Sequence, residues 1–395
     1  MARWLVSEEA APWLELAGRE PEPSSLAAAS RWRRRLPPER AAAVLDQAAL
    51  RRRARSKLGE WADQVFLTRA GLEMATRADV ARWRAARLVA AGVTRLTDAG
   101  TGLGIDALAG VLAGLDVRAI ERDPTTAVLA RANLARAGRP SGAAGSVTVE
   151  HHEVTDLATL APGPGEALFV DPSRRTEAGP TWDIHLLTPT WEQVRAVLTA
   201  PADDGGAVVA KLGPGVAHRH IPETAAATWV SHAGDLVELS LWRGPWPAGE
   251  RTAVLLPDGH SLPAGRSNPP PGPLGAFLFE PDPAVIRAGA VGELAERLGA
   301  RPVAERIAYL TGDQPQVTPF ASRFEVLEVL PYRDKAVRAW LRAHHVGVVE
   351  IKTRGLDLDP ARWRRRLAPV GPNQATLVAT PVGGEAAVLV ARRVS

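Results

Sequence analysis

The amino-acid sequence predicts an α/β protein built on a mostly parallel sheet. Between residues 94 and 212, short apolar runs of strand length alternate with segments of helical periodicity, which is typical of a parallel sheet with helices on its faces. The expected strands are Thr94–Ala99, Val117–Glu121, Val147–His151, Ala167–Val170 and Ala207–Leu212. A glycine-rich segment directly after the first strand and a proline-rich segment near residue 270 complete the pattern.

Two further apolar runs extend the predicted sheet to seven strands. They are Leu236–Trp242 and Thr252–Leu256, and the link between them contains Gly244, Pro245 and Pro247. Because this link is too short for a crossover helix, the two strands are expected to pair antiparallel. The sequence therefore predicts a seven-stranded sheet with an antiparallel end.

The sheet domain is expected to cover residues 93–260 and to follow a helical N-terminal region. Residues 1–92 are rich in alanine and arginine, and their apolar positions recur at helical spacing. Residues 261–323 begin with five prolines between Ser261 and Gly275, which indicates a stiff linker, and continue with connecting helices around Val285–Leu298.

A second, small α/β domain is predicted for residues 324–395, where strand and helix patterns alternate again. Its expected strands are Phe324–Leu330, Val346–Thr353, Thr376–Thr380 and Ala386–Ala391, and its expected helices are Asp334–Ala343 and Pro360–Leu367.

Composition excludes several classes of protein. The 395 residues include no cysteine, so disulfides, cysteine-bound zinc or iron–sulfur clusters and cysteine nucleophiles are all excluded. The nine histidines form no convincing metal-binding spacing with the carboxylates, and no metal site is predicted. No window of about 18 apolar residues occurs and no export signal is visible, so we expect a cytoplasmic protein without a membrane partner.

Arginine dominates the basic residues. The chain has 48 basic and 44 acidic residues, a formal net charge of +4, and its only lysines are Lys57, Lys211, Lys335 and Lys352. Permanent positive charge suits phosphate-containing partners, whereas a GC-rich genome would also favour arginine over lysine. The composition leaves both explanations open.

The segment from Asp98 to Gly104 predicts a cofactor loop. Gly100, Gly102 and Gly104 follow the first strand at alternate positions and open onto a helical run, so the backbone can turn sharply and approach a ligand closely. A dinucleotide fingerprint would place glycine at position 105, which is isoleucine here. The spacing therefore favours S-adenosylmethionine over a nicotinamide cofactor.

Two carboxylates after the next strands support this interpretation. Glu121 ends the second strand, where a carboxylate can accept both ribose hydroxyls of a nucleoside cofactor. Asp156 follows the third strand and can accept a hydrogen bond from the adenine amino group, although it can equally cap a helix.

The end of the fourth strand predicts the catalytic position. Ligands bind beyond the carboxyl ends of parallel strands, so Asp171 and Pro172 are expected beside the reactive group of the cofactor, where Asp171 would hold a substrate amine. Arg174 and Arg175 follow directly and can clamp a phosphate or carboxylate of the substrate, or lie on the surface without function. Trp182 can stack on a base or pack in the core.

The missing cysteines also restrict the atom that receives the methyl group. Methylation of pyrimidine C5 needs a thiolate, and radical methylation needs a cysteine-bound cluster, so both are excluded. Nitrogen is the favoured acceptor, and oxygen remains open.

Together, Asp98–Gly104, Glu121 and Asp171-Pro172 resemble the Rossmann-like class I S-adenosylmethionine-dependent methyltransferases. The chain from about Arg55 onward is similar, more narrowly, to bacterial methyltransferases with a C-terminal THUMP-like domain, which are related to RNA guanine-N2 methyltransferases of the trimethylguanosine synthase kind. This narrower resemblance rests on Phe66–Thr68, Gly71–Thr76, Asp171–Arg175 and Glu350–Gly355. It implies that Phe66 and Thr68 lie near the cofactor. Ser173 and Arg174 replace the second proline and the aromatic residue of the amino-methyltransferase pattern.

The excess positive charge lies in the C-terminal region. From Phe324 onward the chain has twelve basic and seven acidic residues, including Lys335, Arg338 and Arg342 at helical spacing and a cluster from Arg362 to Arg366. Such a basic face on a THUMP-like domain implies contact with an RNA backbone, although solvated helices would look the same. Methylation of an RNA base nitrogen is therefore the favoured function. A small-molecule or protein methyltransferase and a non-catalytic, cofactor-sensing RNA-binding protein remain alternatives, and the oligomeric state is not predicted.

Overall fold

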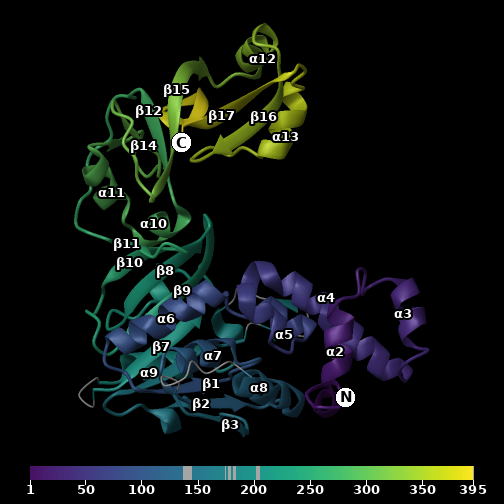
Figure 1. Ribbon diagram of the computed structural model, residues 1–395. Coiled ribbons are helices and arrows are strands. Elements are labelled where there is room, and N and C mark those ends of the chain that lie inside the picture. The colour runs from purple at the N-terminus through teal and green to yellow at the C-terminus, as the bar shows by residue number, and fades with distance from the viewer. Residues whose placement is uncertain (137–144, 174, 177–178, 181–183, 202–204, 395) are drawn as a thin grey trace. The chain divides into compact units, whose positions relative to one another are not determined.

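The computed structural model describes residues 1–136, 145–173, 175–176, 179–180, 184–201 and 205–394 (Figure 1). Contacts within the chain divide it into two compact units. The first unit comprises Met1–Ala227 and Glu238–Gly249, and the second comprises Thr228–Val237 and Glu250–Ser395. The boundary therefore runs through the end of the sheet region. The four-part division expected from the sequence stays a prediction.

The N-terminal part of the first unit is helical. Ser25 caps the third helix by accepting a hydrogen bond from the N–H of Ala28 at 3.1 Å, and Pro38 occupies the first turn of the fourth, where a missing N–H costs little. Gly59, with φ of 53°, ends that helix. The helices are α1 (Ala2–Leu5), α2 (Ala11–Gly18), α3 (Leu26–Trp32), α4 (Pro38–Leu58), the 3-10 helix η1 (Gly59–Asp63), α5 (Arg69–Met74) and α6 (Ala78–Ala90).

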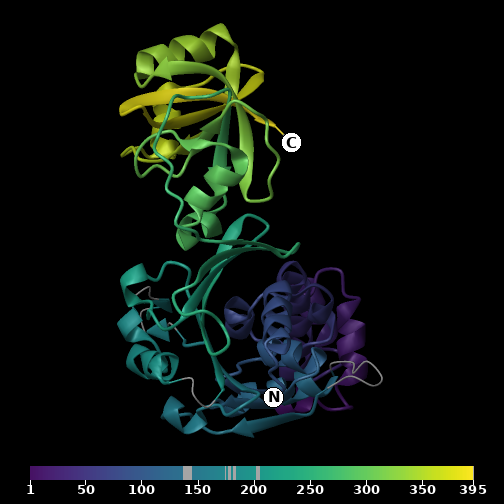
Figure 2. The ribbon, with the colours of Figure 1, turned by 90° about the vertical axis from the view of Figure 1, so that its left-hand side faces the viewer.

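The parallel sheet predicted from the sequence is confirmed, with all five expected strands. Strands β1 (Arg95–Ala99), β2 (Asp116–Glu121), β3 (Val147–His151), β4 (Glu166–Val170) and β7 (Ala207–Leu212) pair in the order β3-β2-β1-β4-β7. In Figure 2, the teal helix α9 lies on one side of this sheet and the blue helices α6 and α7 lie on the other. The connecting helices are α7 (Ile105–Leu112), α8 (Pro124–Arg136), η2 (Leu157–Leu160) and α9 (Trp191–Thr199).

Between β4 and α9 the described residues form short elements. They are β5 (Arg175–Thr176), β6 (Gly179–Pro180) and the 3-10 helix η3 (Ile184–Leu186). An antiparallel bridge between Ser173 and Thr188 joins the two ends of this segment, because each N–H donates to the other's carbonyl oxygen, at 2.8 and 3.1 Å. Another 3-10 helix, η4 (His218–His220), follows β7.

The antiparallel end of the sheet differs from the prediction. Strands β9 (Asp235–Arg243) and β10 (Arg251–Leu256) do not pair with each other, because β8 (Ala226–His232) lies between them in a sheet of order β11-β10-β8-β9-β7-β4-β1-β2-β3, with β11 (His260–Pro263) at its edge. Strand β8 is buried along almost its whole length, so its sequence shows no alternation of apolar and polar residues. Ala233 and Gly234, both with positive φ, join it tightly to β9.

The C-terminal α/β domain also contains strands that the sequence did not reveal. Residues 261–323, expected to be a linker with helices, contribute β12 (Phe277–Pro281), β13 (Arg301–Pro302), β14 (Leu310–Gly312) and the first residues of β15. The expected helical stretch is present as α10 (Pro283–Ala288) and α11 (Val291–Leu298), separated by Gly289 with φ of 77°. The remaining elements are β15 (Ala321–Pro331), α12 (Asp334–Ala343), β16 (Val346–Thr353), α13 (Pro360–Leu367), β17 (Asn373–Val382) and β18 (Glu385–Val394).

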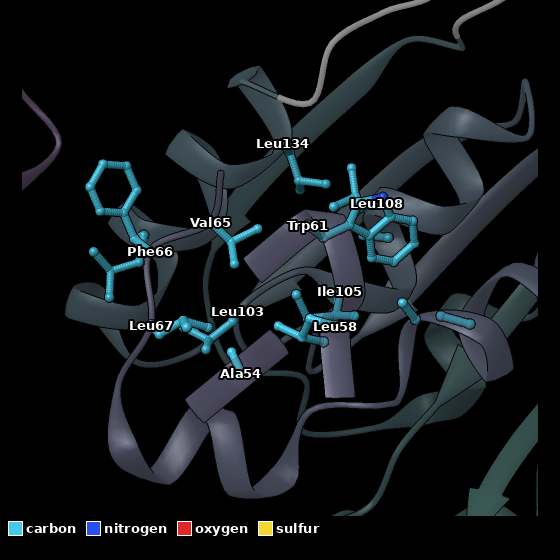
Figure 3. Packing of buried hydrophobic residues seen from close by; sticks show 14 of the residues in the cluster. Ala54, Leu58, Trp61, Val65, Phe66, Leu67, Leu103, Ile105, Leu108 and Leu134 are labelled. Carbon is cyan, nitrogen blue, oxygen red and sulfur yellow. The ribbon is translucent and has the colours of Figure 1, made fainter. Parts of the chain in front are cut away.

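The hydrophobic core of the first unit joins the N-terminal helices to the sheet domain. Figure 3 shows Leu58 of α4, Ile105 and Leu108 of α7 and Leu134 of α8 in a single cluster, and all four side chains are almost fully buried. The N-terminal helices are therefore packed against the helix that follows the glycine loop. None of the helices within the described ranges is long and apolar enough to cross a membrane.

Candidate active site

The glycine loop lies between β1 and α7, as the sequence predicts. Gly100, Gly102 and Gly104 have φ values of 87°, 57° and 80°, a region that residues with a β-carbon rarely adopt. A β-carbon built at Gly100 or Gly102 would meet no atom within 4 Å, so the loop faces open space at these two positions. An exposed backbone next to the start of a helix is suited to a ligand that approaches closely.

Two carboxylates flank this loop. Asp98, at the end of β1, is 1% exposed and accepts a hydrogen bond from Thr101 Oγ1 at 2.6 Å. Burial and the nearby charge of Asp106 raise the pKa of Asp98 to about 7. Glu121, at the end of β2, accepts hydrogen bonds from the N–H of Gly102 at 2.9 Å and of Asp123 at 2.8 Å. The structure thus brings Asp98, Glu121 and the glycines together.

Asp156 is not joined to this group by any contact in the described part of the chain. Its side chain is exposed and accepts a hydrogen bond from the N–H of Ala158 at 2.9 Å, which caps η2. The capping role is therefore present in the structure, and contact with adenine stays a prediction.

Phe66 and Thr68 lie on a segment that is fastened to the glycine loop. Buried Asn133 accepts a hydrogen bond from Phe66 N–H at 2.6 Å and donates to the carbonyl oxygens of Phe66 and Leu103, at 3.1 and 2.9 Å. The phenyl ring is fully buried, and Thr68 caps α5 through Gly71 N–H at 2.9 Å. The segment is close to the loop, but direct contact of these two side chains with a cofactor stays a prediction.

Asp171 follows β4 directly and pairs with a lysine that the sequence analysis did not single out. Residues of β4 lie opposite residues of β7 that are 40 positions later, from Ala167 with Ala207 to Val170 with Ala210. The same offset brings Asp171 to Lys211, and Asp171 Oδ2 lies 2.5 Å from Lys211 Nζ. Pro172, the residue that follows Asp171, is buried.

Burial raises the pKa of Asp171 above its ordinary value, and the Lys211 ammonium counteracts part of this effect. Burial alone would lower the pKa of Lys211, but the charges of Asp171 and Asp106 raise it. Lys211 therefore stays a cation, and its charge favours the ionised, hydrogen-bond-accepting form of Asp171.

The other predicted substrate residues are Arg174, Arg175 and Trp182. Arg174 and Trp182 lie outside the described residues. Arg175 begins β5, but its side chain is also outside the described part of the structure.

The sequence analysis also did not identify a buried charge network that joins α6 to β9. Arg84 is 2% exposed, forms ion pairs with Asp106 and Glu238, and lies 4.7 Å from the centroid of the Phe169 ring. Thr76 donates to Asp106 at 2.6 Å. A buried arginine on an amphipathic helix has no local sequence signal. The scarcity of lysine was the one available hint for Lys211, since a lysine kept in an arginine-rich chain suggests a need for a compact charge.

The residues present fit S-adenosylmethionine. The carboxylates of Asp98, Asp106, Glu121 and Asp171 lie at or near the carboxyl ends of β1, β2 and β4, and they outnumber the buried cations Arg84 and Lys211. An excess of carboxylates suits a cofactor that carries a sulfonium and an ammonium group. The described residues contain no cluster that could hold a metal ion.

This parallel sheet, with a glycine loop after its first strand and carboxylates at its carboxyl edge, defines a Rossmann-like methyltransferase domain. The chain is 31% identical, over 87% of its length and 94% of theirs, to two proteins from strains of Mycobacterium tuberculosis named as uncharacterized S-adenosylmethionine-dependent methyltransferases. It therefore belongs to the S-adenosylmethionine-dependent methyltransferases, and S-adenosylmethionine is its cofactor.

Three further comparisons concern the two ends of the chain and its fold. Residues 321–393 match the family described as THUMP domain-like, and residues 2–54 match a domain of unknown function, DUF8688. The crystal structure of a candidate methyltransferase from Porphyromonas gingivalis W83 has the same fold, with a TM-score of 0.77, 23% identity and 97% coverage of both chains.

Proposed function

We propose that this methyltransferase transfers the methyl group of S-adenosylmethionine to a base nitrogen of RNA. The observation that carries the RNA part is the basic face of the THUMP-like domain, formed by α12 and α13. The face consists of exposed Lys335, Arg338, Arg342, Arg362, Arg364, Arg365 and Arg366. Asp334 of α12 joins this helix to α13. It accepts a hydrogen bond from Trp363 Nε1 at 2.8 Å and forms an ion pair with Arg366 at 3.0 Å.

Most cations of the basic face are available to a ligand. Five of them form no ion pair with the described residues, namely Lys335, Arg342, Arg362, Arg364 and Arg365. Cations that are not held in an ion pair are suited to phosphate groups, whose neutralisation supplies most of the affinity for nucleic acid. The apolar sides of the same helices are buried through Val337, Leu341, Trp363 and Leu367, so their basic sides face outward.

In the first unit, which contains the glycine loop, Gly100, Gly102 and Glu121 would hold the nucleoside part of the cofactor. Asp98 would lie near the positively charged part of the cofactor. The bound cofactor supplies an electrophilic methyl group. Asp171 would accept a hydrogen bond from the base amine and so hold the nitrogen lone pair toward that methyl group, while Pro172 fixes the turn. With no cysteine in the chain, nitrogen is an acceptor that needs no covalent enzyme intermediate.

The decisive experiment is nucleoside mass spectrometry of RNA from a strain in which the gene is deleted. We expect one methylated nucleoside to be missing and to be restored by the purified enzyme with S-adenosylmethionine, but not by the Asp171→Ala variant. An unchanged nucleoside profile, together with labelled methyl transfer to protein or to small molecules in an extract, would reject RNA as the substrate.

A further inference from the structure

The ion pair between Asp171 and Lys211 is incomplete within the protein. Asp171 Oδ2 is bound to Lys211 Nζ at 2.5 Å, whereas Oδ1 accepts no hydrogen bond from the described residues. Lys211 likewise makes this one hydrogen bond in the described part of the chain, although its ammonium has three N–H groups. The side chains are 34% and 13% exposed, so the pair is partly desolvated yet open to a ligand.

Other buried charges of the same protein are more fully satisfied. Glu238 accepts hydrogen bonds from Arg84 at 2.6 and 2.8 Å and from Ser240 at 2.7 Å. A buried ion pair is stabilising only when further hydrogen bonds occupy its remaining donors and acceptors. The Asp171–Lys211 pair makes no such further bonds with the described residues, and because it is partly exposed, its remaining acceptor and donors are open to a ligand.

A comparison of the lysines leads to the same conclusion. Lys57 Nζ donates to the carbonyl oxygens of Leu72 and Glu73 at 2.9 and 2.8 Å, and Lys352 Nζ has the two carboxylate partners Glu280 and Glu350. Within the described part of the chain, Lys211 has a single partner, Asp171. Because a lysine ammonium directs three donors from one nitrogen, Lys211 can bind Asp171 and a second acceptor at once.

We propose that Asp171 and Lys211 together form a hydrogen-bonding clamp for the edge of the substrate, in which Asp171 Oδ1 accepts from the methyl-accepting nitrogen and Lys211 donates to an acceptor atom next to it. The inference rests on the proposed function and narrows its substrate class. The substrate has an N–H group beside a ring nitrogen or a carbonyl oxygen, as nucleobase edges have. Isolated aliphatic amines, such as the side chain of a protein lysine, lack the second atom.

The clamp also assigns a role to Lys211 beyond holding Asp171. If Lys211 only positioned Asp171, its loss would weaken every amine ligand to the same extent. If it contacts the substrate, its loss removes the preference for ligands that have an acceptor next to the amine. The ratio of two affinities therefore separates the two roles.

The test uses the full-length protein saturated with S-adenosylhomocysteine and two small probes, at a pH where both probes are uncharged. 2-Aminopyridine has an amino group beside a ring nitrogen, and aniline has the same group without this acceptor. Ligand-observed NMR titration is expected to show about tenfold tighter binding of 2-aminopyridine, as a hydrogen bond to a charged donor predicts. The Lys211→Met variant should bind both probes equally, and Lys211→Arg, which retains donors, should keep part of the preference.

A second variant protects the test against misfolding. Lys211→Met combined with Asp171→Asn leaves no unpaired buried charge, and it should also bind both probes equally while retaining affinity for S-adenosylhomocysteine. Equal affinities in the wild type, or a preference that survives Lys211→Met, would overturn the clamp. Failure of the proposed function would appear elsewhere, as an unchanged RNA nucleoside profile with the probe preference intact.

Discussion

Arg84 on α6 and Glu238 on β9 form an ion pair in which Arg84 Nη2 donates to both carboxylate oxygens, at 2.6 and 2.8 Å, although the two residues are 154 positions apart in the sequence. Both side chains are 3% exposed. The pair fastens the helix that precedes β1 to the antiparallel strand beside β7, and Asp106 in the first turn of α7 completes it. This network fixes the elements around the carboxyl ends of β1, β4 and β7.

Arg84→Met should lower the free energy of unfolding by about 3–5 kcal/mol, because it leaves Glu238 and Asp106 as buried charges without a partner. Chemical denaturation measures this change. The matched control is Arg118→Met on β2, whose ion pair with Glu150 is exposed and should contribute about 0–1 kcal/mol. Equal effects of the two variants would contradict a structural role for the buried network.

Asp98→Asn should increase stability at high pH. The pKa of Asp98 is about 7 in the folded protein and 3.8 as its ordinary value, so the folded state holds the proton more tightly. This contribution to stability is complete below pH 3.8 and is lost as the pH rises through about 7, by at most about 1.4 kcal/mol per pH unit. The stability of the variant relative to the wild type should therefore grow between pH 5 and pH 8 in thermal denaturation.

Asp116→Asn is the control for this pH dependence. Hydrogen bonds from Ser146 lower the pKa of the exposed Asp116, so its contribution to stability has the opposite sign and is present at neutral pH. If the Asp98 and Asp116 variants showed the same trend with pH, the raised pKa of Asp98 would be wrong.

Glu121→Gln should weaken binding of S-adenosylhomocysteine by about tenfold to a hundredfold, because a neutral amide replaces a carboxylate acceptor of charge-assisted hydrogen bonds. Isothermal titration calorimetry measures the affinity. Asp156→Ala tests the second predicted carboxylate in the same assay. A loss as large as that of Glu121→Gln would support contact with adenine, whereas unchanged affinity would leave Asp156 as the cap of η2 only.

Asn133→Leu should both destabilise the protein and weaken cofactor binding, because it removes the hydrogen bonds that join Phe66 to Leu103 of the glycine loop. Gln47→Leu removes a similar pair of hydrogen bonds, to the N–H and carbonyl of Leu67, without touching the loop. Each variant should cost about 1–3 kcal/mol in denaturation. Only the Asn133 variant should lower affinity for S-adenosylhomocysteine, and equal affinities would show that the segment does not support the loop.

Arg362→Gln and Arg365→Gln should reduce the dependence of RNA binding on salt. Each phosphate contact that is lost should decrease the slope of log affinity against log salt concentration by about 0.7–0.9. Fluorescence anisotropy with a labelled tRNA pool over a range of KCl concentrations measures the slope. Arg392→Gln is the control, because Arg392 is exposed but paired with Glu325. The basic face is not an RNA contact if all three variants have the wild-type slope.

Much of the first unit could be predicted because the sequence patterns that identify its strands and its glycine loop are local. The glycine spacing after β1 and the carboxylate at the end of β2 are properties of adjacent residues. The strands β1, β2, β3, β4 and β7 follow from short apolar runs. Strand β8 was missed because burial of both faces removes the alternation that identifies a strand, while Thr228 and Ser231 interrupt the apolar run that identified β4 and β7. Strands β12 to β14 were missed because they pair with β15 or with one another, across gaps filled by helices and prolines.

The sequence by itself determined the cofactor loop, the five parallel strands and the exclusion of cysteine chemistry, since these depend on three glycines, on short apolar runs and on composition. Only the tertiary structure decided that Asp171 is paired with Lys211 and that Arg84 is enclosed by two carboxylates. These pairs depend on strand register and on burial, which bring together charges that are 22 to 154 residues apart. The low dielectric of the interior then makes each partner essential to the other.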